Sequence, residues 1–375
     1  MDVTNLLPEL VNGLVNFSWG NLLMILVGSG LILLAVAKEY EPVLLLPIGF
    51  GCILANIPLT GMTGPEGLFG VLYRAGISTE LFPLLIFVGI GAMIDFSPLL
   101  AQPKMVLLGA AGQFGIFGTL ILATLLGYPL NQAASIGIIG AIDGPTAIFV
   151  SARLAPELIA PIAVAAYSYM SLIPIIQPPI MRLLTTKKER LIRMEYSPRP
   201  VSRKTLVAFP VVVTLVIGLL VPEATPLISM LMLGNLLRES GVVDRLSKSA
   251  QNEIANIATL FLGVTIGSTM NAASFLNWAT LGILALGLLA FILDTVAGLL
   301  FGKLMSFMSK GTINPLIGAA GISAFPMAGR LAAKMAQEED FDNFILMHAM
   351  GANTAGQLGS VMAGGVLLAI VSGLV

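Results

Sequence analysis

The chain has 375 residues, of which 57% are hydrophobic and only 10% charged, and its formal net charge is −1. A soluble domain carries about 25% charged residues, so this composition predicts an all-α polytopic membrane protein. The single cysteine, Cys52, and the single histidine, His348, exclude a disulfide framework, a cysteine-based metal site and a histidine cluster, and the basic residues form no face for nucleic acid.

The sequence divides into four regions. Residues 1–20 are expected to form an amphipathic helix, because apolar residues recur at helical spacing there. Residues 21–183 and 205–375 are each expected to form a membrane repeat, joined by a linker at 184–204. Candidate spanning segments lie at about 21–37, 43–57, 82–101, 104–127, 134–154, 158–183, 205–221, 225–237, 255–272, 279–306, 312–334 and 344–373. Several are short or interrupted by Gly and Pro, so we expect about 10 to 12 crossings.

The linker is the most basic part of the chain. The stretch from Arg182 to Lys204 holds eight of the 19 Lys and Arg residues and only two acids. Basic loops concentrate on the cytoplasmic side of membrane proteins, so the linker is predicted to be cytoplasmic. The acidic run from Glu338 to Asp342 has little topological weight and fits either side.

Short motifs recur in both halves in the same order. The matched residues are Ile139 to Ala141 with Ile317 to Ala319, Arg153 with Arg330, Met170 with Met350, and Gln177 with Gln357. Their nearly constant offset predicts an internal repeat. Interrupted segments in corresponding positions of two halves are typical of a transporter with a central site at the bilayer midplane.

The first interrupted segment carries Asp143-Gly144-Pro145 inside an apolar run. A carboxylate at the centre of a membrane helix costs about 2.5–3.5 kcal/mol. The Gly-Pro pair removes a backbone donor and disfavours continued helix, so the acid lies where backbone carbonyls become free. Such an arrangement favours a small hard cation such as Na⁺. The alternative is a kinked helix with a buried, neutral Asp143.

The second interrupted segment runs from Asn314 to Pro326 and carries amide and hydroxyl groups in place of an acid. Asn314 and Ser323 fit equally well as Na⁺ ligands and as local caps of the backbone. Arg330 ends this segment, where it could bond helix-end carbonyls, extend to the interface or meet an anion.

Further polar residues lie on the segments that follow the two breaks. Asn353, Gln357 and Ser360 share one helix face, either as contacts between helices or as part of a site. Tyr169 could face the same cavity as Asp143, where its hydroxyl could relay a proton or bond a carbonyl. Asp294 and Asp95 are the other intramembrane acids and are weaker candidates.

Three long motifs resemble the β subunit of the sodium-pumping, biotin-dependent decarboxylases. They run from Gly140 to Thr146, from Tyr169 to Pro179 and from Gly351 to Gly365. That family includes the oxaloacetate, methylmalonyl-CoA, glutaconyl-CoA and malonate enzymes. The resemblance covers nearly the whole chain, whose length is closer to the shorter CoA-ester forms.

The resemblance implies a bacterial inner-membrane complex. A carboxyltransferase α subunit carboxylates biotin on a carrier subunit, a small membrane δ or γ subunit completes the assembly, and the β subunit forms a homotrimer. The β subunit decarboxylates carboxybiotin, consumes a proton and exports Na⁺. The implied fold is an elevator-type inverted repeat with a moving core domain. Such a repeat needs an odd number of crossings per half, so one of the six segments in each half must be re-entrant or stop short.

The resemblance also assigns roles to individual residues. It implies catalytic roles for Asp143, Tyr169, Ser323 and Arg330, and a Na⁺ site formed by Asp143, Asn314, Ser323, Asn353 and Ser360. Gly318 matches a further family position in the second break.

One other function remains compatible with the residues, and a second is disfavoured by them. A stand-alone Na⁺-coupled transporter, either a Na⁺/H⁺ antiporter or an anion symporter, would also use broken helices and a buried acid. A scaffold that only docks soluble partners on the linker would have no use for them. The chain carries no biotin-attachment motif and no phosphate-binding glycine loop, so carboxybiotin would have to come from a partner.

Overall fold

The computed structural model describes residues 12–39, 41–195, 201–275 and 277–374, and within these ranges it is helical and without strands. This confirms the all-α prediction. Residues 12–15 are helical, whereas the rest of the predicted amphipathic helix lies largely outside the described residues. The α-helices are α2 (Trp19–Lys38), α3 (Pro42–Ala55), α4 (Leu68–Leu72), α5 (Leu81–Met93), α6 (Ser97–Ala101), α7 (Val106–Ala111), α8 (Phe114–Leu125), α9 (Leu130–Gly137), α10 (Gly144–Leu154), α11 (Ile159–Leu184), α12 (Lys187–Arg190), α13 (Arg203–Leu220), α14 (Thr225–Ser240), α15 (Asp244–Ser249), α16 (Ala255–Ser268), α17 (Ala272–Phe275), α18 (Trp278–Met308), α19 (Met327–Glu339) and α20 (Leu346–Leu374).

Six helical stretches in the described residues are long and apolar enough to cross a membrane, which confirms a polytopic membrane protein. They are Trp19–Lys38, Pro103–Leu125, Pro156–Leu184, Arg203–Leu220, Trp278–Met308 and Leu346–Gly373. A seventh candidate, Leu68–Ile77 with Leu81–Met93, is bent by 58° at its break. The other expected segments are shorter or interrupted helices, and the count of about 10 to 12 crossings stays a prediction.

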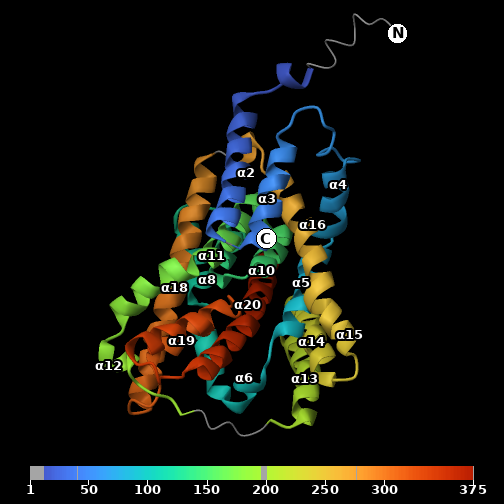
Figure 1. Cartoon of the computed structure of the whole chain (residues 1–375). Coiled ribbons are helices and arrows are strands. Elements are labelled where there is room, and N and C mark those ends of the chain that lie inside the picture. The colour runs from blue at the N-terminus through green and yellow to red at the C-terminus, as the bar shows by residue number, and fades with distance from the viewer. Residues whose placement is uncertain (1–11, 40, 196–200, 276, 375) are drawn as a thin grey trace, which may run out of the picture.

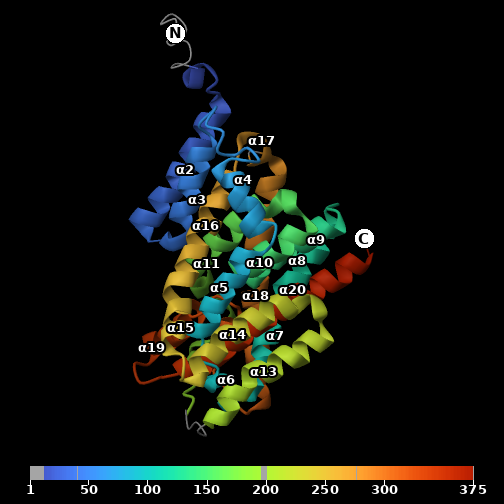
Figure 2. The ribbon, with the colours of Figure 1, turned by 90° about the vertical axis from the view of Figure 1, so that its right-hand side faces the viewer.

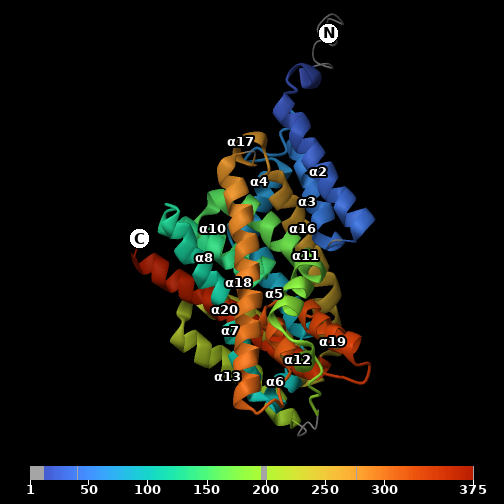
Figure 3. The same ribbon diagram turned by 90° about the vertical axis from the view of Figure 1, so that its left-hand side faces the viewer.

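The helices form an elongated bundle. The α2 and α17 helices lie toward one end, while α6 and α13 lie toward the other (Figures 1 and 2). The α18 helix, 31 residues long, runs through most of the height of the bundle (Figure 3). Its N-terminus is capped by Asn277, whose side chain accepts a hydrogen bond of 2.8 Å from the Thr280 N–H.

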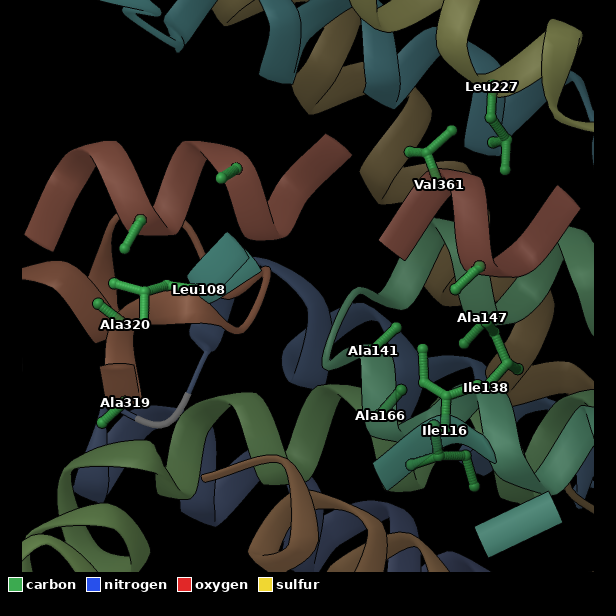
Figure 4. Packing of buried hydrophobic residues seen from close by; sticks show 14 of the residues in the cluster. Leu108, Ile116, Ile138, Ala141, Ala147, Ala166, Leu227, Ala319, Ala320 and Val361 are labelled. Carbon is green, nitrogen blue, oxygen red and sulfur yellow. The ribbon is translucent and has the colours of Figure 1, made fainter. Parts of the chain in front are cut away.

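The segments that carry the two breaks share one core. Leu108 of α7 and Ile116 of α8 are fully buried in it, together with Ile138 of the first break and Ala320 of the second (Figure 4). The interrupted segments are therefore buried in protein, as backbone without helical hydrogen bonds must be at membrane depth.

The basic linker is tied to the acidic run. Arg190 pairs with Glu339 at 2.6 Å and Arg193 with Asp340 at 2.7 Å. These pairs place the acidic run, which the sequence left open, on the same side of the protein as α12. Single exposed ion pairs contribute little, but several that join the same two segments hold them in register.

Candidate functional site

The helix that contains Asp143 is interrupted where the sequence predicts. The α9 helix passes into a 3₁₀ turn, Ile138–Ala141, and Ile142 adopts a left-handed φ of 51°. Asp143 is extended, and α10 then begins with Gly144 and Pro145. Pro145 suits the first turn because its missing N–H would have no helical partner there.

The Asp143 carboxylate is 4% exposed and receives three side-chain hydrogen bonds. Thr146 Oγ1, Gln357 Nε2 and Ser360 Oγ lie 2.6, 2.9 and 3.2 Å from its Oδ2 atom. Hydrogen bonds to a carboxylate stabilise its charged form. Because all three end on Oδ2, they leave Oδ1 without a side-chain donor among the described residues. These donors stabilise the charged form that an ion-binding carboxylate needs, whereas burial opposes that form.

The second interrupted segment meets the first one. Its 3₁₀ turn covers Pro315–Gly321, and the Ser323 hydroxyl that follows donates to the Ala141 carbonyl of the first break. Asn353 of α20 donates to Ile322 O at 2.7 Å. The Asn353 Oδ1 atom is buried and has no hydrogen-bond partner among the described residues. The sequence predicted that the two breaks form one site, and the structure brings them into contact.

A cavity of about 620 Å³ opens beside Asp143. Ser323, Arg330 and Gln357 line it together with Asp143. Arg330 is exposed and makes no ion pair among the described residues, so its guanidinium is available to an anion. The cavity therefore combines the Asp143 carboxylate, the Ser323 hydroxyl and the Arg330 guanidinium. The first two suit a small bound cation and the third suits an anionic group beside it.

Two tyrosines on α11 lie differently relative to the cavity, and Tyr169 makes the carbonyl bond that was one of its two predicted roles. The Tyr169 hydroxyl donates to the Leu284 carbonyl of α18, and Tyr169 does not line the cavity. Tyr167 does line it, with its ring packed so closely on Gly144 that a Cβ there would lie 2.0 Å from the ring. The Tyr167 hydroxyl is buried without a hydrogen-bond partner among the described residues. Sequence reasoning missed Tyr167, because a glycine at position 144 indicates close packing there without saying which side chain packs on it.

Asn314 acts as a cap in this structure. Its Oδ1 accepts from Leu316 N at 3.0 Å, and its Nδ2 donates to the Arg190 and Ile192 carbonyls of the linker, both at 2.9 Å. Asn314 does not line the cavity beside Asp143. Of the two roles that the sequence left open, the geometry supports the cap. Asn314 bonds the linker, whereas Ser360 bonds Asp143 and Asn353 bonds the Ile322 carbonyl next to Ser323, although these two residues do not line the cavity either.

Three further charged residues have partners of their own. Arg153 pairs with Glu80 and, at 3.0 Å, with Glu223, so it is held by acids and not by helix-end carbonyls. Asp95 lies at the edge of the cavity, where it pairs with Arg238 at 3.5 Å. Asp294 is fully buried, and its Oδ1 accepts from Gly115 N.

The polar groups of the site are of the kind that bind a hard cation. Among the described residues no group of three or more His, Cys, Asp and Glu side chains is placed to hold a metal ion. The side chains that bond the Asp143 carboxylate are two hydroxyls and an amide, from Thr146, Ser360 and Gln357. Such oxygens suit Na⁺ better than zinc or copper, which prefer nitrogen and sulfur.

Comparison with known proteins agrees with this chemistry. The family model for the Na⁺-transporting oxaloacetate decarboxylase beta subunit matches residues 20–371. The chain is 53% identical over 362 residues to the glutaconyl-CoA decarboxylase subunit beta of Acidaminococcus fermentans, and 54% over 361 residues to the methylmalonyl-CoA decarboxylase subunit beta of Veillonella parvula. It is 47% identical over 420 aligned positions to the oxaloacetate decarboxylase beta chain of Klebsiella pneumoniae. Each match covers at least 96% of both chains. The chain belongs to the family of Na⁺-transporting decarboxylase beta subunits.

Proposed function

We propose that this chain is the membrane subunit of a Na⁺-exporting decarboxylase complex. The observation that carries the proposal is the Asp143 carboxylate, which lies in a gap between two helices and opens into a cavity with Arg330 and Ser323. The family match supports the same function. In this function the chain removes CO₂ from carboxybiotin, consumes a proton and moves Na⁺ out of the cytoplasm.

In the proposed Na⁺ site, Asp143 supplies the charge. Its Oδ2 is occupied by three donors, so Oδ1 serves as the ligand. Ser323, Ser360 and the unpaired Oδ1 of Asn353 supply further oxygens. A buried carboxylate without a counter-ion is costly in a membrane, and a Na⁺ ion or a proton removes that cost. Exchange between the two at Asp143 would couple proton uptake to Na⁺ release.

Carboxybiotin is the substrate in this proposal and arrives on a partner subunit. Arg330 binds its carboxylate, and the buried surroundings of Asp143 exclude water from the reacting bond. Cleavage of the bond between nitrogen and carbon releases CO₂ and leaves its electron pair on the ureido nitrogen. That nitrogen takes up the proton through Asp143 or Ser323. Tyr169 acts indirectly, because its hydroxyl joins α11 to α18.

The energy requirement agrees with a coupled reaction. Moving one charge across the membrane takes about 2.3 kcal/mol per 100 mV. Decarboxylation supplies this free energy without ATP.

The complex that we propose also contains a carboxyltransferase, a biotin carrier and a small membrane subunit, with three copies of this chain, in the inner membrane of a bacterium. The linker faces the cytoplasm, where those soluble partners lie.

Reconstitution in vesicles tests the proposal. The purified chain would be assayed for ²²Na⁺ uptake with and without carboxylated biotin carrier, and with avidin added to block biotin. We expect uptake and CO₂ release only with carboxylated carrier, and loss of both in Asp143→Asn. Uptake driven by a proton gradient alone would support the stand-alone transporter, and full activity in Asp143→Asn would exclude Asp143 as the coupling residue.

A further inference from the structure

The bend between α7 and α8 contacts the second interrupted segment and α20 at the same point. Gln113 lies in this bend and is only 5% exposed. Its Nε2 atom lies 3.1 Å from Gly109 O of α7, 3.3 Å from Gly356 O and 3.4 Å from Gly321 O. Gly321 ends the 3₁₀ turn just before Ser323, and Gly356 directly precedes Gln357. One side-chain amide therefore bridges two backbone segments that both carry residues of the site.

The bend and α20 both approach the backbone of the second interrupted segment too closely to leave room for a side chain. A Cβ at Gly112 would lie 2.2 Å from Gly321 O, and a Cβ at Gly356 would lie 2.3 Å from the same atom. The carbonyl oxygens of Gly321 and Gly356 both lie within hydrogen-bond distance of Gln113 Nε2, and a buried carbonyl left without a donor is costly. The Gln113 amide is that donor.

The same bend also reaches the first interrupted segment. The N–H of Gly115 donates to Asp294 Oδ1 of α18. The other oxygen of Asp294 would lie 2.9 Å from a Cβ at Gly140, in the 3₁₀ turn that leads to Asp143. The region of the bend is thus in contact with both interrupted segments, and the Gln113 side chain connects α20 to the second interrupted segment.

We propose that Gln113 is a positioning residue of the Na⁺ site. It holds the α20 backbone at Gly356 against the second break, and so sets the distance between the donors on α20 and Ser323. Gln357 and Ser360 bond Asp143 from α20, whereas Ser323 bonds Ala141 from the second break. Both contacts depend on that spacing. This inference rests on the proposed function, because it assigns Gln113 a part in the Na⁺ site of that function.

Na⁺-dependent thermal stability of the purified full-length chain tests the role. Unfolding would be followed while NaCl replaces choline chloride at constant ionic strength, which gives the half-saturating Na⁺ concentration. Gln113→Met keeps the size of the side chain and removes the donor. We expect its half-saturating Na⁺ concentration to rise about tenfold, with a much smaller change in the unfolding temperature without Na⁺. Gln132→Met, on the exposed side of α9, is the matched control and should behave as wild type.

A second variant keeps the test decisive if Gln113→Met fails to fold. Gly356→Ala pushes α20 away from Gly321 O without removing any donor, whereas Gly373→Ala, on the same helix, meets nothing within 4 Å. Only the first should weaken Na⁺ binding. A lower unfolding temperature with half-saturation within about twofold of wild type overturns the positioning role. Absence of any Na⁺ response in wild type, or a full response in Asp143→Asn, overturns the proposed Na⁺ site itself and the inference with it.

Discussion

Gln357 donates a hydrogen bond of 2.9 Å to Asp143, a residue 214 positions earlier in the chain. The acid of the first half is therefore held by a donor from the second half. Ser360, one turn further along α20, lies 3.2 Å from the same carboxylate oxygen. Any displacement of α20 relative to α10 changes the surroundings of Asp143, which is the property a coupled ion site requires.

Gln357→Leu tests this contact. The variant removes one charge-assisted hydrogen bond from the carboxylate at nearly constant volume, at a cost of about 1.5–3 kcal/mol. We expect the half-saturating Na⁺ concentration for decarboxylation to rise by about tenfold to a hundredfold. The assay is CO₂ release by the reconstituted complex as a function of Na⁺ at constant ionic strength. A wild-type Na⁺ response in a folded Gln357→Leu protein would remove Gln357 from the site.

Gly144→Ala tests the close packing of Tyr167. The added Cβ would lie 2.0 Å from ring atoms of Tyr167, so α10 and α11 must move apart. Overpacking of this kind costs about 1–3 kcal/mol. We expect a lower unfolding temperature and a strong loss of Na⁺-dependent decarboxylation. Gly118→Ala is the matched control, since its Cβ meets nothing closer than 3.4 Å. Equal behaviour of the two variants would contradict the packing described.

Local sequence signals predicted the position of the first break but not its partners. Asp143 is followed directly by Gly144 and Pro145 in an apolar run. The residues that interrupt the helix are therefore adjacent to the buried acid, and a local pattern is enough to find both. The Gln357 contact depends on how α20 packs against α10, and no local pattern encodes that. The spacing of Asn353, Gln357 and Ser360 predicted a shared polar face, yet not which of them reaches Asp143.

The two tyrosines show a second limit. Tyr167 and Tyr169 are two positions apart on α11, so their side chains point to nearly opposite sides of the helix. The sequence contains both and does not say which side faces the cavity. Asn314 is a similar case, because an asparagine at a helix start caps the backbone or binds an ion with the same oxygen. Only the tertiary contacts with the linker separate the two roles.

The third prediction concerns Asp294 and tests whether this acid only accepts a structural hydrogen bond or also exchanges a proton. Asp294→Asn keeps the acceptor for Gly115 N, whereas Asp294→Leu leaves that buried N–H unpaired, at a cost of about 1–3 kcal/mol. We expect the Asn variant to unfold near the wild-type temperature and to transport Na⁺, and the Leu variant to unfold at a lower temperature. A folded Asn variant without Na⁺ transport would mean that Asp294 must ionise during the cycle.

The contact between the linker and the acidic run gives a prediction on pH. The Arg193 guanidinium, which hydrogen-bonds Asp340, lowers the pKa of that carboxyl below its usual value. Burial raises the pKa of Glu189, but hydrogen bonds from Thr186 and the charge of Lys303 outweigh burial and leave the pKa below its usual value. A carboxyl whose pKa is lowered in the folded protein stabilises it above its usual pKa, and this contribution is lost as pH falls through the lowered value.

The linker should therefore keep its contact with α18, through Glu189 and Lys303, and with the acidic run, through Arg193 and Asp340, across the neutral range. It should lose these contacts only below about pH 4. Hydrogen exchange of residues 187–193, corrected for the intrinsic pH dependence of exchange, measures this directly. Arg193→Gln, which keeps a donor but removes the charge, should lose part of the protection already at neutral pH. Loss of protection between pH 7 and pH 5 in the wild-type chain would show that groups other than these carboxylates hold the linker.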